Sequence, residues 1–276
     1  MFVKTDFTNS IAKFIKSLHN AKKREENKLF LVEGNKCCSE LVDNVPASRI
    51  DFIVINKSKL DGELLKLVEK FYKSGVTKIY EAQDNIFKNL TDTVTPQSIL
   101  AVVKMPDASI IKISSELPIV ILDSISDPGN VGTIIRTADW FGVKQIILAG
   151  DCAGQYSPKV VRSTMGSIFR VNILDLDYNS VKKIFSQKKF ANTNVLAATL
   201  DAKKTLEKIK INNGENFCLI VGNESRGISA ELKNIITEKF IISGEGEAES
   251  LNVAVACGIS LHSLFGSYKK HNYIKK

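Results

Sequence analysis

The chain has 276 residues, of which 44% are hydrophobic and 25% are charged, and its formal net charge is +8. These values describe a globular protein of one large or two ordinary domains. The excess positive charge favours an anionic partner, and nucleic acid is the commonest of these.

Five cysteines, an odd number without CxxC spacing, exclude a disulfide framework and a zinc site and indicate a reducing compartment. No apolar stretch reaches the roughly 18 residues that a membrane span needs. The N-terminus also lacks the apolar core of a signal peptide. The sequence therefore predicts a cytoplasmic protein without a membrane segment and without a metal site.

The first part of the chain predicts a small α/β unit that begins with an amphipathic helix. Ile11, Phe14, Ile15 and Leu18 recur at helical spacing and form one apolar stripe. A polar loop is expected directly after this helix. It carries Lys22, Lys23 and Arg24, whose exposed charges would be free to meet phosphates. Strands are expected at residues 29–32, 52–55, 78–80 and 99–103, and helices at 35–41 and 64–71.

A segment punctuated by proline and serine, residues 105–115, is the best linker candidate. It predicts two domains, residues 1–106 and residues 114–276. Beyond it, apolar runs alternate with helical patterns, which predicts a doubly wound α/β domain with a parallel sheet. The expected strands are 119–122, 145–149, 195–199, 217–221 and 239–242, and the expected helices are 132–141, 159–167, 180–188, 230–237 and 252–265.

Three motifs stand where an apolar run gives way to a helical pattern. They are Asp127–Gly132 with Arg136 beyond it, Gly222–Gly227, and Glu249–Ala256. In open α/β proteins this point is the carboxyl end of a strand, where ligands bind.

Each motif also has a purely structural interpretation. Asp127 followed by Pro128 is a good helix start, and Ser250 or Asn252 would cap the last helix. Glu224 beside Arg226 would form an exposed ion pair that contributes little. Neither a Walker loop nor GxGxxG is present, so nothing supports a nucleoside triphosphate or NAD.

Taken together and in this order, the motifs resemble those of the SpoU/TrmH branch of the SPOUT methyltransferases, over residues 118–266. Residues 9–104 look like the family's small RNA-binding domain, which is itself similar to certain ribosomal proteins. The resemblance implies an α/β fold with a trefoil knot, a homodimer, and S-adenosylmethionine as cofactor. The sequence departs from the family's pattern at Ser243, where the family often has proline.

The resemblance also implies roles for individual residues. Arg136 would bind the neighbouring phosphate and stabilise the forming alkoxide, because a guanidinium holds its proton too firmly to serve as a base. The residues implied in catalysis are Asn130, Arg136, Glu224, Ser250 and Asn252. Those implied in cofactor binding are Thr199, Leu200, Gly222, Ile242 and Leu251, and those in RNA binding are Lys22, Lys23 and Arg24.

The function expected is methyl transfer from S-adenosylmethionine to a ribose 2′-hydroxyl of structured RNA, with ribosomal RNA favoured over transfer RNA. The alternative is a non-catalytic RNA-binding assembly factor with the same fold, against which the intact Asn130, Arg136, Glu224 and Asn252 argue. A dinucleotide-dependent oxidoreductase fits the alternating pattern but lacks the glycine fingerprint.

Overall fold

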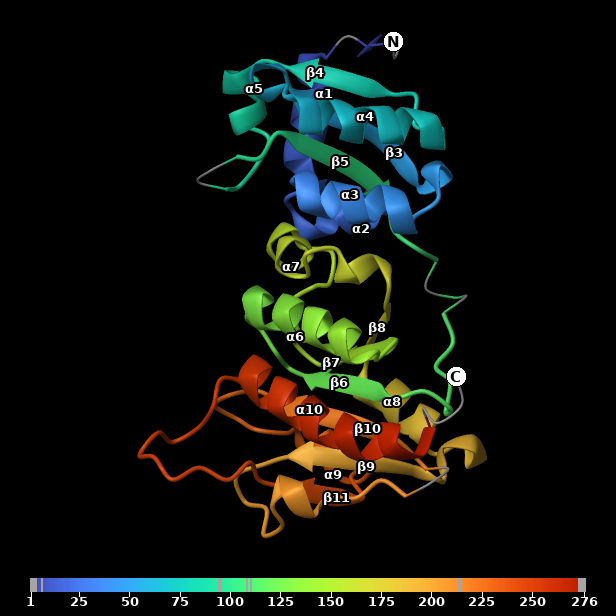
Figure 1. The fold of residues 1–276 in the computed structure, drawn as a ribbon, viewed down its shortest axis with the longest axis vertical. Coiled ribbons are helices and arrows are strands. Elements are labelled where there is room, and N and C mark those ends of the chain that lie inside the picture. Colours follow the sequence, from blue (N-terminus) through green and yellow to red (C-terminus); the bar gives the residue numbers. More distant parts are fainter. Residues whose placement is uncertain are drawn as a thin grey trace. The chain divides into compact units, whose positions relative to one another are not determined.

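The computed structural model describes residues 4–5, 7–93, 96–107, 109, 111–212 and 215–272. The chain divides into two compact units, each built on its own sheet (Figure 1). The first unit comprises residues 1–107 together with residues 154–170, and the second comprises residues 108–153 and 171–276. Residues 154–170, named here the inserted segment, thus come from the middle of the sequence assigned to the catalytic domain.

The first unit contains a five-stranded mixed sheet in the order β1-β4-β3-β5-β2. Its central strand β3 pairs parallel with β4 and antiparallel with β5. The four strands expected from the sequence are confirmed, and the two-residue β1 is added. The bounds are β1 (Lys4–Thr5), β2 (Leu29–Glu33), β3 (Ile50–Asn56), β4 (Ile79–Ala82) and β5 (Ile99–Lys104).

Helices cover both faces of this sheet. On one face Ile15 and Leu18, at the end of α1, pack with Phe87 of α5 against Val54. On the other face α3 packs against α4, β2 and β5, and α7 packs against β2. Burying an apolar side chain of this size contributes about 1.5–3 kcal/mol. The helices are α1 (Asn9–Ser17), α2 (Ala21–Asn27), α3 (Asn35–Asn44), α4 (Gly62–Ser74), α5 (Asp84–Lys88) and α7 (Pro158–Ser163).

The expectation of a loop after the first helix is wrong, because helix α2 occupies this position. Its side-chain cap is Asn20, and Lys22 and Lys23 are exposed on it as predicted. The expectation that Arg24 is exposed is wrong, because only 6% of this residue is accessible. Its Nη1 donates hydrogen bonds to the carbonyl oxygens of Leu18 (2.9 Å) and His19 (2.8 Å). Arg24 therefore satisfies carbonyls that the end of α1 leaves without helical partners.

The inserted segment is held to the rest of the first unit by an aromatic contact and by ion pairs. The rings of Phe30 and Tyr156 lie 4.6 Å apart. Glu33, which is 7% exposed, accepts a hydrogen bond of 3.2 Å from Arg162 Nη1. Val160 and Val161 of α7 are buried.

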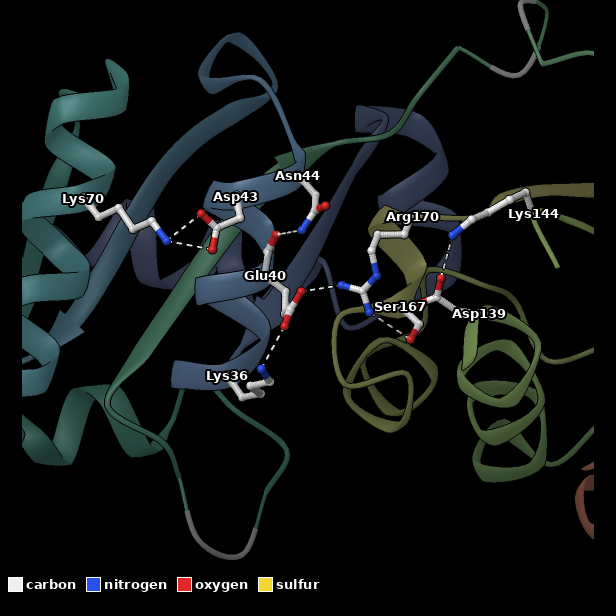
Figure 2. Close-up of polar contacts among 9 residues, drawn as sticks. All are labelled: Lys36, Glu40, Asp43, Asn44, Lys70, Asp139, Lys144, Ser167 and Arg170. Carbon is white, nitrogen blue, oxygen red and sulfur yellow. Dashed lines mark hydrogen bonds and ion pairs between the residues drawn. The ribbon is translucent and has the colours of Figure 1, made fainter. Parts of the chain in front are cut away.

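Glu40 on α3 is the second anchor of the inserted segment (Figure 2). Its carboxylate accepts from Lys36 Nζ at 2.8 Å and pairs with Arg170, which also donates to Ser167. These partners hold the pKa of Glu40 below its ordinary value, with the Lys36 hydrogen bond the main cause. Gly166 (φ +95°) has no room for a side chain, since a Cβ there would lie 2.4 Å from Glu40 Cβ.

The second unit contains six parallel strands in the order β11-β9-β10-β6-β7-β8. Strands β6 and β7 are buried along their whole length, as their continuous apolar sequences predicted. Strand β8 was not expected. The bounds are β6 (Ile119–Asp123), β7 (Gln145–Ala149), β8 (Asn172–Leu176), β9 (Thr193–Ala198), β10 (Asn216–Gly222) and β11 (Glu238–Phe240).

Helices cover this sheet on both faces as well. Val181 of α8 and Leu232 of α9 pack with Ile121 and Ile220 on one face. Helices α6 and α10 pack against each other, and α10 also packs against β10, on the face to which the alternate strand residues point. The helices are α6 (Pro128–Phe141), α8 (Tyr178–Phe185), α9 (Ala230–Lys233) and α10 (Val253–Asn272). Helix α9 is shorter than the 230–237 expected.

In the described ranges, no helix combines the length and apolar character that a membrane crossing requires. All five cysteines lie in described residues and are free thiols. Burial raises the pKa of Cys37 to about 11 and that of Cys257 to about 12, so both thiols stay protonated at neutral pH.

Candidate active site

The site lies at the carboxyl edge of the parallel sheet, where β6 and β10 are neighbours and Asp123 pairs in register with Gly222. Strand β6 continues in sequence to β7 on one side, whereas β10 on its other side comes much later in the chain. Such a reversal of strand order opens a crevice at the strand ends. The first motif follows β6, the second follows β10, and the third leads into α10.

Glu224 joins all three motifs. Its Oε1 accepts hydrogen bonds from Asn130 Nδ2 (3.1 Å), Asn252 Nδ2 (3.0 Å) and the backbone N–H of Val253 (3.3 Å). Asn252 Nδ2 also donates to Asn130 Oδ1 at 3.1 Å. Glu224 and Asn252 are exposed, and Asn130 is partly exposed. The structure thus brings together three of the five predicted catalytic residues in one solvent-facing cluster.

The same residues also perform the structural roles that the sequence allowed. Asp127 accepts from the N–H of Asn130 (2.8 Å) and caps α6, with Pro128 in its first turn. Asn252 Oδ1 accepts from the N–H groups of Ala254 and Val255 at the start of α10. The two roles are therefore compatible. Asn130 uses its backbone N–H and Asn252 uses its Oδ1 at the start of a helix, and both donate from Nδ2 to Glu224.

The second motif folds into the tight turn that its glycines predicted. A Cβ on Gly222 would lie 2.5 Å from the carbonyl oxygen of Gly227, so only glycine fits there. Gly227 has φ +66° and donates from its N–H to the carbonyl of Asn223 at 2.8 Å. Asn223 Oδ1 accepts from the N–H groups of Ser225 and Arg226. Glu224 bonds to the asparagines rather than to Arg226.

Two predicted catalytic residues stand outside the cluster. Arg136 lies six residues beyond Asn130 on α6, which is roughly 9 Å along the helix and about 120° around it. Its side chain is exposed and forms no hydrogen bond or ion pair with the residues that the structure describes. Ser250 is exposed two residues before Asn252 and likewise has no partner among the described residues.

The predicted cofactor residues lie at the ends of three neighbouring strands. Thr199 and Leu200 follow β9, Gly222 ends β10, and Ile242 follows β11. Leu251 precedes Asn252 at the start of α10. Leu200 is 70% exposed and Leu251 is 46% exposed, and both are large apolar side chains that face solvent. In the part of the chain that the structure describes, no three His, Cys, Asp or Glu side chains group to hold a metal ion.

A buried polar network under the second motif was missed by sequence reasoning. Asp123, only 1% exposed, accepts from the hydroxyl of Tyr178 (2.8 Å) and from the N–H of Ser229 (2.6 Å). Asn223 Nδ2 donates to the carbonyl of Ser124 at 3.0 Å. The one local signal was an aspartate at the end of the apolar run 119–122.

Residues 118–262 match the SpoU rRNA methylase family, and residues 9–101 match the MRM3-like substrate binding domain. With the three motifs joined at one sheet edge, this chain belongs to the SpoU rRNA methylase family, as the motif resemblance predicted.

Several relatives resemble it along most of its length. The 23S rRNA (guanosine(2553)-2′-O)-methyltransferase RlmP of Bacillus subtilis is 30% identical over 94% of this chain and 97% of the relative. The 23S rRNA (uridine(2479)-2′-O)-methyltransferase of Streptomyces viridochromogenes is 29% identical over 74% of this chain and 70% of its own length. The structure of an S-adenosylmethionine-bound rRNA methyltransferase from Sinorhizobium meliloti superimposes with a TM-score of 0.80, at 28% identity, over 98% of both chains.

Proposed function

We propose that this protein transfers a methyl group from S-adenosylmethionine to a ribose 2′-hydroxyl of ribosomal RNA. The observation that carries the proposal is the cluster of Asn130, Glu224 and Asn252, which unites three motifs at the edge where α/β proteins bind ligands. Family membership and the names of both curated relatives, each a 23S rRNA 2′-O-methyltransferase, support this reaction and ribosomal RNA as the substrate.

The cofactor would be held by Thr199, Leu200, Gly222, Ile242 and Leu251. The exposed apolar side chains at this edge fit a ligand with a flat base, because binding would remove Leu200 and Leu251 from water. The S-adenosylmethionine-bound state of the Sinorhizobium relative supports the same choice. When bound, the cofactor supplies an electrophilic methyl group on a sulfonium.

The chain's own side chains would orient the ribose and stabilise charge. Glu224 Oε1 is engaged by three donors, while Oε2 has no hydrogen-bond partner among the described residues and is available to substrate. Asn130, Ser250 and Asn252 would orient the ribose by hydrogen bonds. Arg136 would bind the adjacent phosphate and stabilise the alkoxide that forms as the hydroxyl loses its proton.

A homodimer, in which a second copy completes each site, is part of the proposal. Val255 and Ile259 lie four residues apart on α10 and are 50% and 39% exposed. Trp140, near the end of α6, is 85% exposed. Exposed apolar side chains on two helices that pack together are typical of a surface that contacts another protein. Arg136, unpartnered on the same α6, would then act on RNA bound across the interface.

The division of labour and the knot are proposed as well. Residues 1–106 would bind substrate RNA, now through Lys22 and Lys23 without Arg24, and residues 114–276 would carry catalysis. The trefoil knot is supported by the strand order, which takes the chain from the edge strand β11 back to α10 beside β10 and α6.

Mapping ribose methylation in RNA from cells with and without this gene tests the function. One 2′-O-methyl group is expected to disappear from ribosomal RNA in the deletion, and the purified chain should restore it with S-adenosylmethionine. Loss of a methyl group from transfer RNA instead would show that transfer RNA is the substrate. Specific binding of ribosomal RNA without any methyl transfer would favour the assembly factor, and NAD binding without S-adenosylhomocysteine binding would refute the cofactor.

Arg136→Ala tests the assignment of this side chain to RNA. We expect kcat to fall at least about 100-fold, as when one group that stabilises developing charge is removed. The affinity for S-adenosylhomocysteine should stay within a few-fold, since Arg136 is not assigned to the cofactor. Lys183→Ala, which removes an exposed positive charge from α8, is the matched control. Near-parental turnover on the native RNA would remove Arg136 from the mechanism.

A further inference from the structure

The buried network at the end of β6 contains a residue from outside all three motifs. Tyr178, at the start of α8, donates its hydroxyl hydrogen to Asp123 Oδ1 at 2.8 Å. The same hydroxyl lies 3.0 Å from Ser124 Oγ. A tyrosine hydroxyl carries one hydrogen, so Ser124 must be the donor in that second contact. Tyr178 thereby ties together the last residue of β6 and the first residue of the loop that follows.

Asp123 and Ser124 in turn hold both ends of the second motif. Asp123 Oδ2 accepts from the N–H of Ser229 at 2.6 Å, beyond the turn. The carbonyl of Ser124 accepts from Asn223 Nδ2 at 3.0 Å, before it. Between these two fixed points stands Glu224. The position of its exposed carboxylate therefore depends on the hydrogen bonds of Asp123 and Ser124, and Tyr178 contacts both of these residues.

The backbone around Tyr178 is shaped to fit this hydroxyl. Ser124 has φ +55°, a left-handed conformation that is rare for residues other than glycine. Gly150 has φ +67°, and a Cβ there would lie 2.2 Å from the Tyr178 hydroxyl and 2.6 Å from Ser124 Oγ. The absence of a side chain at Gly150 thus leaves room for the Tyr178 hydroxyl group and its contact with Ser124.

We propose that Tyr178 is a positioning residue for methyl transfer, which acts through Asp123 and Ser124 to fix the loop of residues 222–229 and so the carboxylate of Glu224. The inference rests on the proposed role of Glu224. Burial raises the pKa of Tyr178 above its ordinary value, so the hydroxyl keeps the proton that it donates. A buried carboxylate that loses one of its two donors is costly, and a shift of the loop would relieve that cost.

Tyr178→Phe in the full chain is the direct test, because it removes only the hydroxyl group. We expect kcat to fall about tenfold, as for the loss of one hydrogen bond to a charged group. The KM for RNA should change less than threefold, since no RNA contact is removed, and kcat is calculated for the folded fraction of each variant, because partial unfolding alone would also lower the apparent kcat at constant KM. Tyr72→Phe on α4 is the matched control, since that side chain is 39% exposed. Parental kcat in Tyr178→Phe would overturn the proposal.

A double-mutant cycle separates positioning from general destabilisation. In a Glu224→Gln background, measured under single-turnover conditions, Tyr178→Phe should cause almost no further loss of rate, because both changes act on one group. In an Asp123→Asn background Tyr178→Phe should likewise add little. Losses that multiply in both backgrounds would show that Tyr178 is only structural and refute the inference.

The cycle also distinguishes this inference from the proposed function. If Glu224→Gln alone keeps the parental rate, the assigned role of Glu224 fails, whatever Tyr178 does. If Glu224→Gln is slow while Tyr178→Phe is normal, only the present inference fails.

Discussion

The two units use their polar side chains in different ways. In the second unit Asn130, Glu224 and Asn252 converge on a sheet edge and still face solvent. In the first unit Arg24 caps a helix end, and Glu33 and Glu40 bind arginines of the inserted segment. Much of that charge stabilises the fold and is not available to a ligand. The net charge of a chain therefore overestimates how much charge is available to bind a ligand. A cluster of polar side chains at the edge of a sheet is better evidence of a binding site.

Gly222→Ala should have the largest effect on the second unit. A Cβ would meet the backbone of Gly227 at 2.5 Å, and a backbone carbonyl cannot move aside as a flexible side chain can. The second motif would be displaced, and the affinity for S-adenosylhomocysteine should fall at least about tenfold in calorimetry, or 1.4 kcal/mol. Gly244→Ala, with open space around its Cβ, is the control. An unchanged affinity for S-adenosylhomocysteine would show that this turn does not contribute to cofactor binding.

Gly166→Ala tests whether the inserted segment belongs to the first unit. The substitution places a Cβ against Glu40 at a residue with φ +95°, so we expect stability to fall by about 2–3 kcal/mol. Gly142→Ala, at φ +85° with nothing within 4 Å, should cost only the backbone strain of about 1–2 kcal/mol. Denaturant unfolding measures both. Limited proteolysis within residues 154–170 should increase for Gly166→Ala alone, and equal protection in both variants would contradict the assignment.

A third comparison should separate Arg24 from its neighbours on α2. Arg24→Ala leaves two helix-end carbonyls unsatisfied and should lower stability by about 1–3 kcal/mol, with the salt dependence of RNA binding unchanged. Lys22→Ala with Lys23→Ala should leave stability within about 0.5 kcal/mol and reduce the log–log salt slope by about 1.4–1.8. The control, Lys57→Ala with Lys66→Ala, removes the same charge from exposed positions elsewhere. A slope that responds to Arg24 would mean that its charge reaches RNA after all.

Elements with a strong apolar pattern could be predicted from the sequence, and elements without one could not. Strands β6 and β7 are buried on both faces, so their sequences are continuously apolar. Strand β8, at the sheet edge, is interrupted by exposed Asn172 and Asp175. The sequence of α2 has no apolar stripe.

The same limit applies to the site. The three motifs were visible because each is a local run of residues at a strand end. Contacts between distant residues left no local pattern. Tyr178 and Asp123 are 55 residues apart, and Glu33 and Arg162 are 129 apart. Nothing near Arg24 in the sequence reveals that the end of α1 encloses its guanidinium.

The inserted segment has a consequence for synthesis of the chain on the ribosome. The first unit is not complete when residue 107 emerges, because α7 and the arginine partners of Glu33 and Glu40 come roughly 60 residues later. At 5–20 residues per second, translation takes about 3–12 s to supply them. During that interval the buried carboxylate of Glu33 has Thr93 but not Arg162 as a donor, and the β2 surface that receives α7 is uncovered. The first unit can therefore reach its complete form only after residue 170 has emerged, when β6 and β7 of the second unit have already been synthesised.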